Sequence, residues 1–335
     1  MAKANLSLKD KEKPFILIAA IVVGMLINRW FGGAAEGLYG LVNVGLFVVI
    51  YAIMLFVEVK DIGRAFTKVR PTILALLTNF VFTPFFAWFL GWLFLRNFPD
   101  LWAGVVLYKL TPCIGWYLIF IDLAEGDVPW GVALLPWNLF LQILLLPVYL
   151  WVLVGQVVPV DALNLIRSVA LFLLLPFALG WATRLALVRW RGQAWTYGPF
   201  KHFIGEVKLW ALVAVIIGIF ASQNAINLSE LSRVALIILV ISLFFMSMFL
   251  IGLAVGRGFR LGYADTTTLV FTTTARNSEA VLPVAAAVFP GHPLVIFAIL
   301  IGPIVELPVL LFLSRTMLWL RGRMWWFRSP TALAD

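Results

Sequence analysis

The sequence contains little charge, two histidines and one cysteine. Only 12% of its 335 residues are charged and 63% are apolar, whereas soluble domains are about 25% charged and about 45–50% apolar. Together with a mean hydropathy of +1.02, this composition excludes a water-soluble globule. The single cysteine, Cys113, excludes an internal disulfide and a multi-thiolate metal cluster.

The sequence also lacks the residue patterns of enzymes. His202 and His292 both lie near loops, and no Ser-His-Asp arrangement, metal-ligand spacing or nucleotide-binding motif is present. We therefore expect no enzymatic activity and no cofactor. Without an ATPase motif, the energy for any transport would come from an ion gradient or a separate subunit.

The sequence contains many long apolar runs. About ten runs have the length of roughly 20 residues that a helix needs to cross a bilayer, and they predict an all-α integral membrane protein. The first run follows a short polar segment without a small-residue cleavage site, so we expect it to be retained. The predicted spans are 14–31, 38–58, 71–95, 101–121, 129–154, 162–188, 208–226, 232–256, 266–289 and 293–318.

The basic residues predict the orientation in the plasma membrane. If the spans alternate in direction, 19 Lys and Arg residues fall on one side, including both terminal segments, and 4 fall on the other. The positive-inside rule then places both termini in the cytoplasm. The net charge of +9 is explained by this topology and by contact with anionic membrane lipid, so we expect no nucleic-acid partner.

Two spans carry helix-breaking sequences at matching depths. Pro112 interrupts the fourth span, and a polar stretch that ends at Pro283 interrupts the ninth; we predict helix breaks at these two prolines. Open backbone inside a membrane must line a cavity or be buried in protein. Paired interruptions in two halves of a chain indicate a transporter binding site between inverted repeats. Asn138 and Glu306 also correspond between the halves, at a shift of about 168 residues.

Four ionisable residues fall well inside the predicted spans. They are Lys109, Arg276, Glu279 and Glu306. A charge at the bilayer centre costs about 2.5–3.5 kcal/mol on insertion scales, so these residues should face a cavity or neutralise one another. Arg276 and Glu279 are three positions apart and would share one helix face, while the sequence leaves open whether Arg276 pairs instead with Glu306.

Cys113 directly follows the predicted break at Pro112. Free backbone N–H groups and the helix dipole at the start of the second half-helix would favour an anion, such as a thiolate. A cysteine in an apolar surrounding is equally well explained as a small buried hydrophobic residue. The sequence leaves both readings open.

These features resemble those of the arsenical-resistance (arsenite efflux) transporters of the bile acid/sodium symporter superfamily. The resemblance covers nearly the whole chain. It is carried by Thr111-Pro-Cys113, Gly126-Asp127, the helix around Asn138, the region of Asn277, and the segment Gly302-Pro-Ile-Val-Glu-Leu-Pro308.

The resemblance implies that Cys113 and Glu306 are a functional pair. It also implies two inverted halves of about five spans each, in which the broken fourth and ninth helices cross. The spans would form a panel domain and a core domain, followed by a cytoplasmic tail. The implied ranges are residues 1–70 (spans 1–2) and 161–230 (spans 6–7) for the panel, 71–160 (spans 3–5) and 231–320 (spans 8–10) for the core, and 321–335 for the tail.

The sequence departs from the sodium-coupled relatives at the residues that bind sodium there. Tyr117 and Leu118 replace ligands in the fourth span, and Thr272 and Arg276 replace ligands in the ninth. Hard cations need oxygen ligands, usually including a carboxylate. A guanidinium at this place would repel sodium and substitute for its charge, so we expect no sodium site and no sodium coupling.

The leading hypothesis is export of trivalent arsenic by proton antiport. The lone thiol of Cys113 would capture arsenite transiently, and Glu306 would carry the proton. The alternative is a transporter of a small organic anion, bound through Arg276 and Lys109. The sequence leaves open antimonite as a substrate, the proton stoichiometry and a homodimer. Residues expected to hydrogen-bond the arsenic hydroxyls are Thr111, Asn138, Thr274 and Asn277.

Overall fold

The computed structural model describes most of the chain from residue 68 onward. Within that part the chain is helical, apart from turns, short loops and one isolated β-bridge. The predicted spans 14–31 and 38–58, and the start of 162–188, lie mainly outside the described residues. The structure describes residues 68–113, 116–158, 175–222, 231–289 and 291–323, together with single residues or short pieces between 16 and 55 and residues 167 and 171.

Four helices in this part are long and apolar enough to cross a membrane. Each of them corresponds to a predicted span and extends at most a few residues beyond it. They are Val69–Leu95, Val128–Val154, Arg233–Gly258 and Pro293–Arg321.

The first of these helices contains a π-helical turn. It consists of α3 (Val69–Leu77), η3 (Thr78–Phe82) and α4 (Thr83–Leu95). Because Pro84 has no N–H, the carbonyl of Phe80 loses its α-helical donor, and the hydroxyl of Tyr149 donates a hydrogen bond to it instead. Such π-helical turns are frequent at functional sites.

The fourth predicted span is divided into two helices, and the fifth is continuous. The divided span consists of α5 (Pro99–Leu110) and α6 (Tyr117–Leu123). The continuous span consists of α7 (Val128–Tyr149), which continues as the π-helical η4 (Leu150–Val154). Asp127 caps α7, because its carboxylate accepts a hydrogen bond from the N–H of Trp130 at 2.9 Å.

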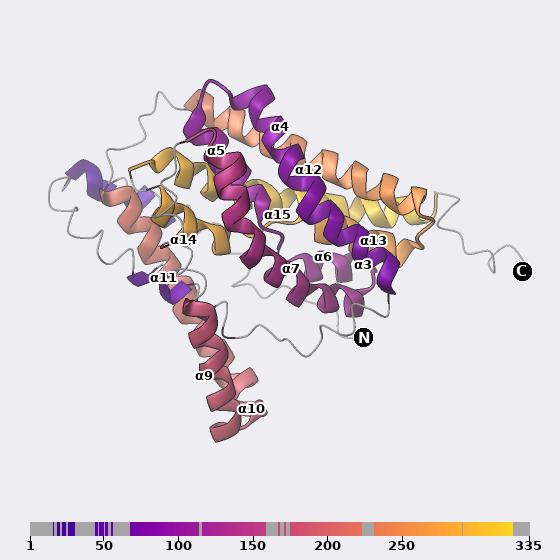
Figure 1. Cartoon of the computed structure of the whole chain (residues 1–335), viewed down its shortest axis with the longest axis horizontal. Helices are drawn as coiled ribbons and strands as arrows, with labels where there is room; N and C mark the ends of the chain where they lie inside the picture. Colours follow the sequence, from indigo (N-terminus) through magenta and orange to yellow (C-terminus); the bar gives the residue numbers. More distant parts are fainter. Residues whose placement is uncertain are drawn as a thin grey trace, which may run out of the picture.

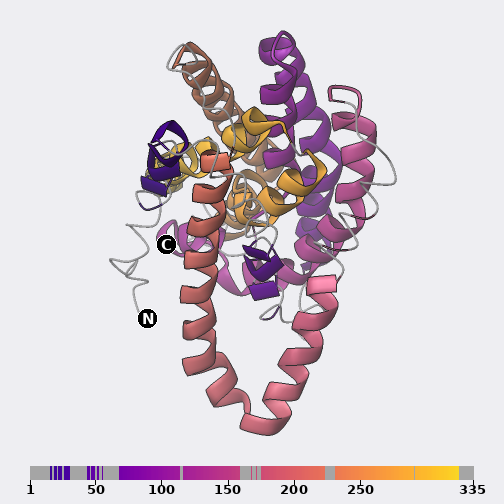
Figure 2. The same cartoon turned by 90° about the vertical axis from the view of Figure 1, so that its left-hand side faces the viewer.

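Two long helices project from the rest of the molecule as the arms of a V (Figure 2). They are α9 (Leu175–Arg191) and α11 (Lys201–Ser222). At the tip of the V, Gly192 has φ +82°, a conformation that favours glycine. The tip itself is formed by α10 (Gln193–Trp195) and η6 (Thr196–Phe200).

The second half of the described chain repeats the pattern of continuous and divided helices. A continuous helix, α12 (Leu231–Gly258), precedes a divided pair, α13 (Tyr263–Thr274) and α14 (Ser278–Val288). A second continuous helix, α15 (Pro293–Arg321), follows. In Figure 1, α5, α12, α13 and α15 lie together in the body of the molecule, with α4 and α7 beside them.

The predicted break at Pro283 is wrong. The ninth span opens between Thr274 and Ser278, and Pro283 lies inside α14. A proline costs a helix one hydrogen bond, but it ends the helix only where the freed backbone finds partners elsewhere. Those partners exist at residues 275–277, which pair with the first interruption, and the side chain of Asn277 caps α14 there.

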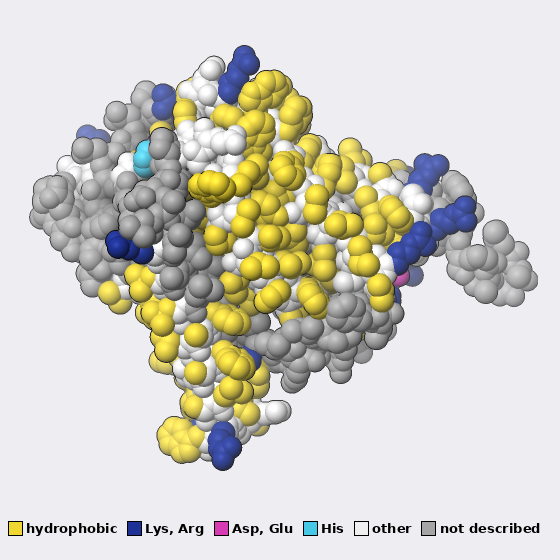
Figure 3. All heavy atoms as spheres, viewed as in Figure 1, with side chains coloured by type: hydrophobic (Ala, Val, Ile, Leu, Met, Phe, Trp, Pro, Cys, Tyr) yellow, Lys and Arg dark blue, Asp and Glu magenta, His cyan; other side chains and the backbone are white. Residues whose placement is uncertain are grey.

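Small residues allow the central helices to pack closely. A Cβ atom at Gly302 would lie 2.3 Å from the ring of Tyr108, and one at Gly104 would lie 2.4 Å from the carbonyl oxygen of Val295. Glycine at these positions therefore brings α5 and α15 into contact, as is typical of membrane helices. On the face in Figure 3, the described side chains are mostly hydrophobic, with Lys and Arg toward the periphery.

Candidate functional site

The two interrupted helices meet at their interruptions, where residues 111–113 and 275–277 form an antiparallel β-bridge. The N–H of Cys113 donates to the carbonyl of Ala275 at 3.0 Å. The N–H of Asn277 donates to the carbonyl of Thr111 at 2.9 Å. These bonds satisfy backbone groups that would otherwise be unpaired inside the membrane. The bridge thus brings Cys113 together with residues of the ninth span.

Asn277 holds the second interruption in place and leaves one polar group unused. Its Oδ1 accepts the N–H of Ala280 at 3.1 Å, and its carbonyl accepts the hydroxyl of Thr111 at 2.9 Å. Its Nδ2 is buried and has no hydrogen-bond partner among the described residues, and the same is true of Oγ1 of Thr274, at the end of α13. Since buried polar groups are normally paired, these two atoms are candidates for contact with a ligand.

The guanidinium of Arg276 is surrounded by oxygen atoms of the protein. The side chain is 3% exposed. Nε donates to the carbonyl of Thr274 at 3.3 Å, and Nη1 donates to that of Lys109 at 3.1 Å. Nη2 donates to Oδ1 of Asn79 at 3.1 Å and to the carbonyl of Thr273. Three of these oxygens are carbonyls at the C-terminal ends of α5 and α13, where the helix dipole favours a cation.

Glu306 lies at the same crossing, on α15. It is 5% exposed. Its Oε1 accepts the backbone N–H of Arg276 at 2.8 Å, and its Oε2 accepts the hydroxyl of Tyr108. The carboxylate therefore contacts Arg276 through the backbone. The expected pairing of Arg276 or Lys109 with Glu279 stays a prediction, because the side chain of Glu279 lies outside the described residues.

Lys109 is fully buried, and its ammonium faces aromatic rings. Nζ lies 3.9 Å from the ring centroid of Phe245, 4.0 Å from that of Tyr108 and 4.5 Å from that of Phe244. Within the described structure Nζ has no hydrogen-bond partner. The direct contacts of the ammonium are therefore cation–π contacts, and the carboxylate of Glu306 acts on it without a hydrogen bond.

Asn79 is a residue of the site that the sequence analysis missed. It lies in η3, and besides contacting Arg276 it donates through Nδ2 to Oδ1 of Asn138 at 3.4 Å and to the carbonyl of Thr272 at 3.1 Å. Asn138 in turn donates to Oγ1 of Thr272 at 3.2 Å. The available signal was a lone amide in the apolar run 71–95, which carries none of the helix breaks or family motifs that drew attention to Asn138 and Asn277.

Cys113 has an apolar environment. It is 2% exposed and belongs to a buried cluster that includes Phe120, Phe271 and Leu310. Of the residues expected to replace sodium ligands in the fourth span, Tyr117 belongs to this cluster and Leu118 packs against it. The hydroxyl of Tyr117 donates to the carbonyl of Gly131 at 2.6 Å.

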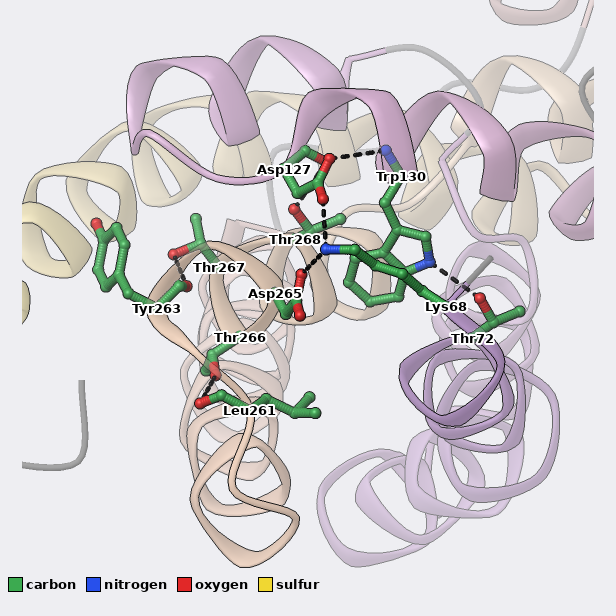
Figure 4. A network of polar contacts seen from close by, with 10 residues as sticks. All are labelled: Lys68, Thr72, Asp127, Trp130, Leu261, Tyr263, Asp265, Thr266, Thr267 and Thr268. Carbon is green, nitrogen blue, oxygen red and sulfur yellow. Dashed lines mark hydrogen bonds and ion pairs between the residues drawn. The ribbon is translucent and has the colours of Figure 1, made fainter. Parts of the chain in front are cut away.

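A second polar cluster lies where α3, α7 and α13 begin (Figure 4). Nζ of Lys68 contacts Oδ2 of Asp127 at 2.6 Å and also pairs with Asp265. The indole of Trp130 donates to the hydroxyl of Thr72 at 3.0 Å. One cation thus holds two carboxylates from two different helices.

The ion pairs of this second cluster change the titration of its residues. Burial opposes the effect, but the hydrogen bond from Lys68 and that from the N–H of Trp130 lower the pKa of Asp127 below its usual value. Burial likewise opposes the effect at Lys68, but its bonds to Asp127 and Asp265 raise its pKa above 10.5. Lys68 and Asp127 are therefore both charged throughout the neutral range.

The long apolar helices and the buried polar crossing define an integral membrane protein. A comparison with family models matches residues 43–249 to the Sodium Bile acid symporter family, and the chain belongs to this family of membrane transporters. This finding confirms the resemblance seen in the sequence and the expectation that the protein is not an enzyme.

Curated relatives match nearly the whole chain. The Arsenical-resistance protein Acr3 of Corynebacterium glutamicum is 27% identical, over 95% of this chain and 90% of its own length. The Arsenical-resistance protein Acr3 of Alkaliphilus metalliredigens is 25% identical, over 90% and 91%. An uncharacterized transporter of Synechocystis is 24% identical, over 95% and 91%.

Proposed function

We propose that the protein exports arsenite across the plasma membrane by proton antiport, without sodium. The relatives named for arsenical resistance support the substrate. The observation that carries the proposal is the crossing itself. Cys113 pairs with the backbone of Ala275, and the next residue, Arg276, donates its N–H to Glu306. A thiol and a carboxylate from distant spans thereby lie at one buried site.

The thiol would capture arsenic by exchange of one bond. Arsenite is present near neutral pH mainly as uncharged arsenous acid, and sulfur suits this soft centre better than oxygen does. A bond forms between Sγ of Cys113 and arsenic, one arsenic–oxygen bond breaks, and the thiol proton leaves with the hydroxyl as water. A single sulfur ligand gives a bond labile enough for release on the other side, and antimonite would react in the same way.

The arsenic hydroxyls would be bound by the unused polar atoms at the crossing. Oγ1 of Thr274 and Nδ2 of Asn277 are buried without partners in the part of the chain that the structure describes, so a ligand that pairs them would remove the cost of leaving them unsatisfied. Thr111 and Asn138 already make hydrogen bonds within the protein. We therefore assign Thr111 and Asn138 the role of positioning the crossing. They would contact the substrate only when the crossing rearranges during transport.

Arg276 supports coupling to protons in place of sodium. Its guanidinium already donates to four oxygens of the protein, the ligand type that a sodium ion would need. Glu306 then carries the coupling proton, since its protonation removes the negative charge of the crossing. The same contacts speak against the organic-anion alternative at Arg276, because its guanidinium nitrogens already donate to oxygens of the protein.

Transport would proceed by movement of the core domain against the panel domain, with both termini in the cytoplasm. The matching order of continuous and divided helices on either side of α9 and α11 supports an inverted repeat of about five spans in each half. In such folds the substrate site lies near the middle of the membrane, where the two broken helices meet, and alternating access moves one domain past the other.

The test is arsenite uptake into everted membrane vesicles energised by a proton gradient without sodium. The native protein should take up arsenite, while Cys113→Ser and Glu306→Gln should not. Arg315→Met, a change of an exposed residue on α15, serves as the control for expression and insertion. Absence of uptake by the native protein, with a maintained gradient and verified expression, would overturn the proposal.

A further inference from the structure

Lys109 stands apart from the other charged groups of the crossing because its ammonium has no hydrogen-bond acceptor among the described residues. Arg276 and Glu306 are both hydrogen-bonded through all their charged atoms. Lys109 is 0% exposed, and Nζ has no hydrogen-bond partner in the part of the chain that the structure describes. An isolated buried ammonium is costly, so its environment needs an explanation.

That environment is a box of three aromatic rings. Tyr108 comes from α5, next to Lys109 itself, while Phe244 and Phe245 come from α12. The ring centroids lie 3.9–4.5 Å from Nζ. Aromatic faces attract a cation but offer neither a counter-charge nor a hydrogen-bond acceptor of the strength of an oxygen. The box can therefore hold the ammonium and can also hold the neutral amine without leaving a partner unpaired.

Of the three charged residues at the crossing, Lys109 is the one best suited to exchange its proton. An arginine keeps its charge in proteins. Glu306 accepts hydrogen bonds at both oxygens, which suits the ionised carboxylate, and its single negative charge is shared between Lys109 and Arg276. The described residues of the crossing therefore carry one positive charge in excess, and Lys109 is the cation without a hydrogen-bond acceptor among them. Loss of its proton would remove that excess.

No other titratable group in the structure as described competes for this role at the box. The groups that face Lys109 are Tyr108 on its own helix, Glu306 on α15 and Arg276 between α13 and α14. The neighbouring helix α4 carries only apolar residues and Thr83, and α12 contributes the two phenylalanines. Helix α14 also packs against α5 and carries Glu279, whose side chain lies outside the described residues. The proton of Lys109 thus responds directly to what binds at the crossing.

We propose that Lys109 carries a proton of its own, which it releases when arsenite binds at the crossing. This inference rests on the proposed function. A bound neutral solute displaces water from the site and makes an unbalanced charge more costly. The ammonium becomes the amine, its proton passes to the solvent, and no electron moves. Since capture by the thiol yields water and no free proton, the proton released on binding comes from the protein.

Calorimetry of arsenite binding to the purified full-length protein tests this inference. The binding enthalpy is measured in two buffers of different ionisation enthalpy, and the difference gives the number of protons released. The native protein should release up to about one proton per bound arsenite, with the number falling as the pH rises and Lys109 becomes neutral beforehand. Lys109→Met and Lys109→Arg should both bind arsenite without this release. Lys201→Met, which changes an exposed lysine on α11, should behave as the native protein does.

A second variant tests the box without changing the lysine. Phe245→Leu removes one ring, so the ammonium should lose its proton more easily and the pH dependence of proton release should move about one pH unit lower. Two outcomes would overturn this inference and leave the proposed function intact. In one, the native protein binds arsenite without releasing a proton. In the other, proton release is retained in Lys109→Arg and lost in Glu306→Gln. Absence of arsenite binding by the native protein would instead overturn the proposed function, and the inference with it.

Discussion

The backbone N–H of Arg276 donates to the carboxylate of Glu306 at 2.8 Å, while the guanidinium of the same arginine turns toward Asn79 and the carbonyl oxygens at the ends of α5 and α13. One residue thus fixes the acidic group through its backbone and fills an oxygen-lined cation site through its side chain. The two roles can be separated by mutation, because the backbone contact remains when the side chain is shortened.

Arg276→Ala should make the protein sensitive to sodium. The change leaves four oxygens without their donor, which should lower stability by roughly 3–5 kcal/mol, and a sodium ion is able to occupy such a group of oxygens. We expect sodium chloride to raise the thermal unfolding temperature of Arg276→Ala in detergent, and choline chloride to leave it unchanged. An equal response to both salts would show that the vacated oxygens do not bind sodium. The native protein should respond alike to the two salts.

Tyr108→Phe should weaken the acidic site while leaving the aromatic box in place. The hydroxyl of Tyr108 is one of the two donors to Glu306, so its removal should cost roughly 1–3 kcal/mol of stability. Unfolding temperature and proton-driven arsenite uptake should both fall. Tyr263→Phe provides the control, since that hydroxyl donates at the far end of α13 to the carbonyl of Ala124. Uptake unchanged by Tyr108→Phe would argue against a role of this hydroxyl in coupling.

Lys68→Met should destabilise the second cluster in a pH-dependent way. The change leaves Asp127 and Asp265 facing each other without their shared cation, at a cost of about 1 kcal/mol for partly exposed pairs. Because the folded state lowers the pKa of Asp127, this contribution is present above the usual aspartate value and disappears as the pH falls through the lowered one. The contribution of Lys68 to stability is present below its usual pKa of 10.5 and disappears as the pH rises through its raised pKa.

The unfolding temperatures of the native protein and Lys68→Met should therefore differ at pH 7 and converge at strongly acidic pH. Arg70→Met is a matched control, since Arg70 is a nearby cation on α3 that contacts the ring of Phe259 and neither aspartate. A difference of the same size for both variants at pH 7 would show that overall charge, rather than this cluster, is responsible.

Asn277→Ala should expose Cys113 more often to a thiol reagent. The side chain of Asn277 caps α14, and loss of a cap costs about 1 kcal/mol, which corresponds to a roughly fivefold increase in opening. Since Cys113 is the only cysteine of the chain, the rate of maleimide labelling reports on this site alone. His292→Ala is the control, because the side chain of His292 makes no capping bond to α15 and contacts Asp100, at the end of α5 that lies away from the bridge. Equal labelling rates of native protein and Asn277→Ala would contradict the predicted role.

Much of the helical architecture follows from the sequence. The predicted spans 71–95, 129–154, 232–256 and 293–318 each correspond to one long apolar helix, because a bilayer requires about 20 apolar residues and leaves the backbone no other way to pair within a single segment. Pro112 likewise lies in the extended segment between α5 and α6, where the missing donor opens the helix.

Tertiary contacts decided what the local pattern could not. Pro283 has the same chemistry as Pro112, yet the ninth span opens at Ala275, because only there does the freed backbone meet partners across the bridge. Asn79 joined the site because a helix distant in sequence placed the guanidinium of Arg276 against it. A single sequence specifies which residues are polar and which segments are long and apolar enough to span a membrane. Which buried groups satisfy one another, and which remain unpaired, depends on the packing of helices that are remote along the chain.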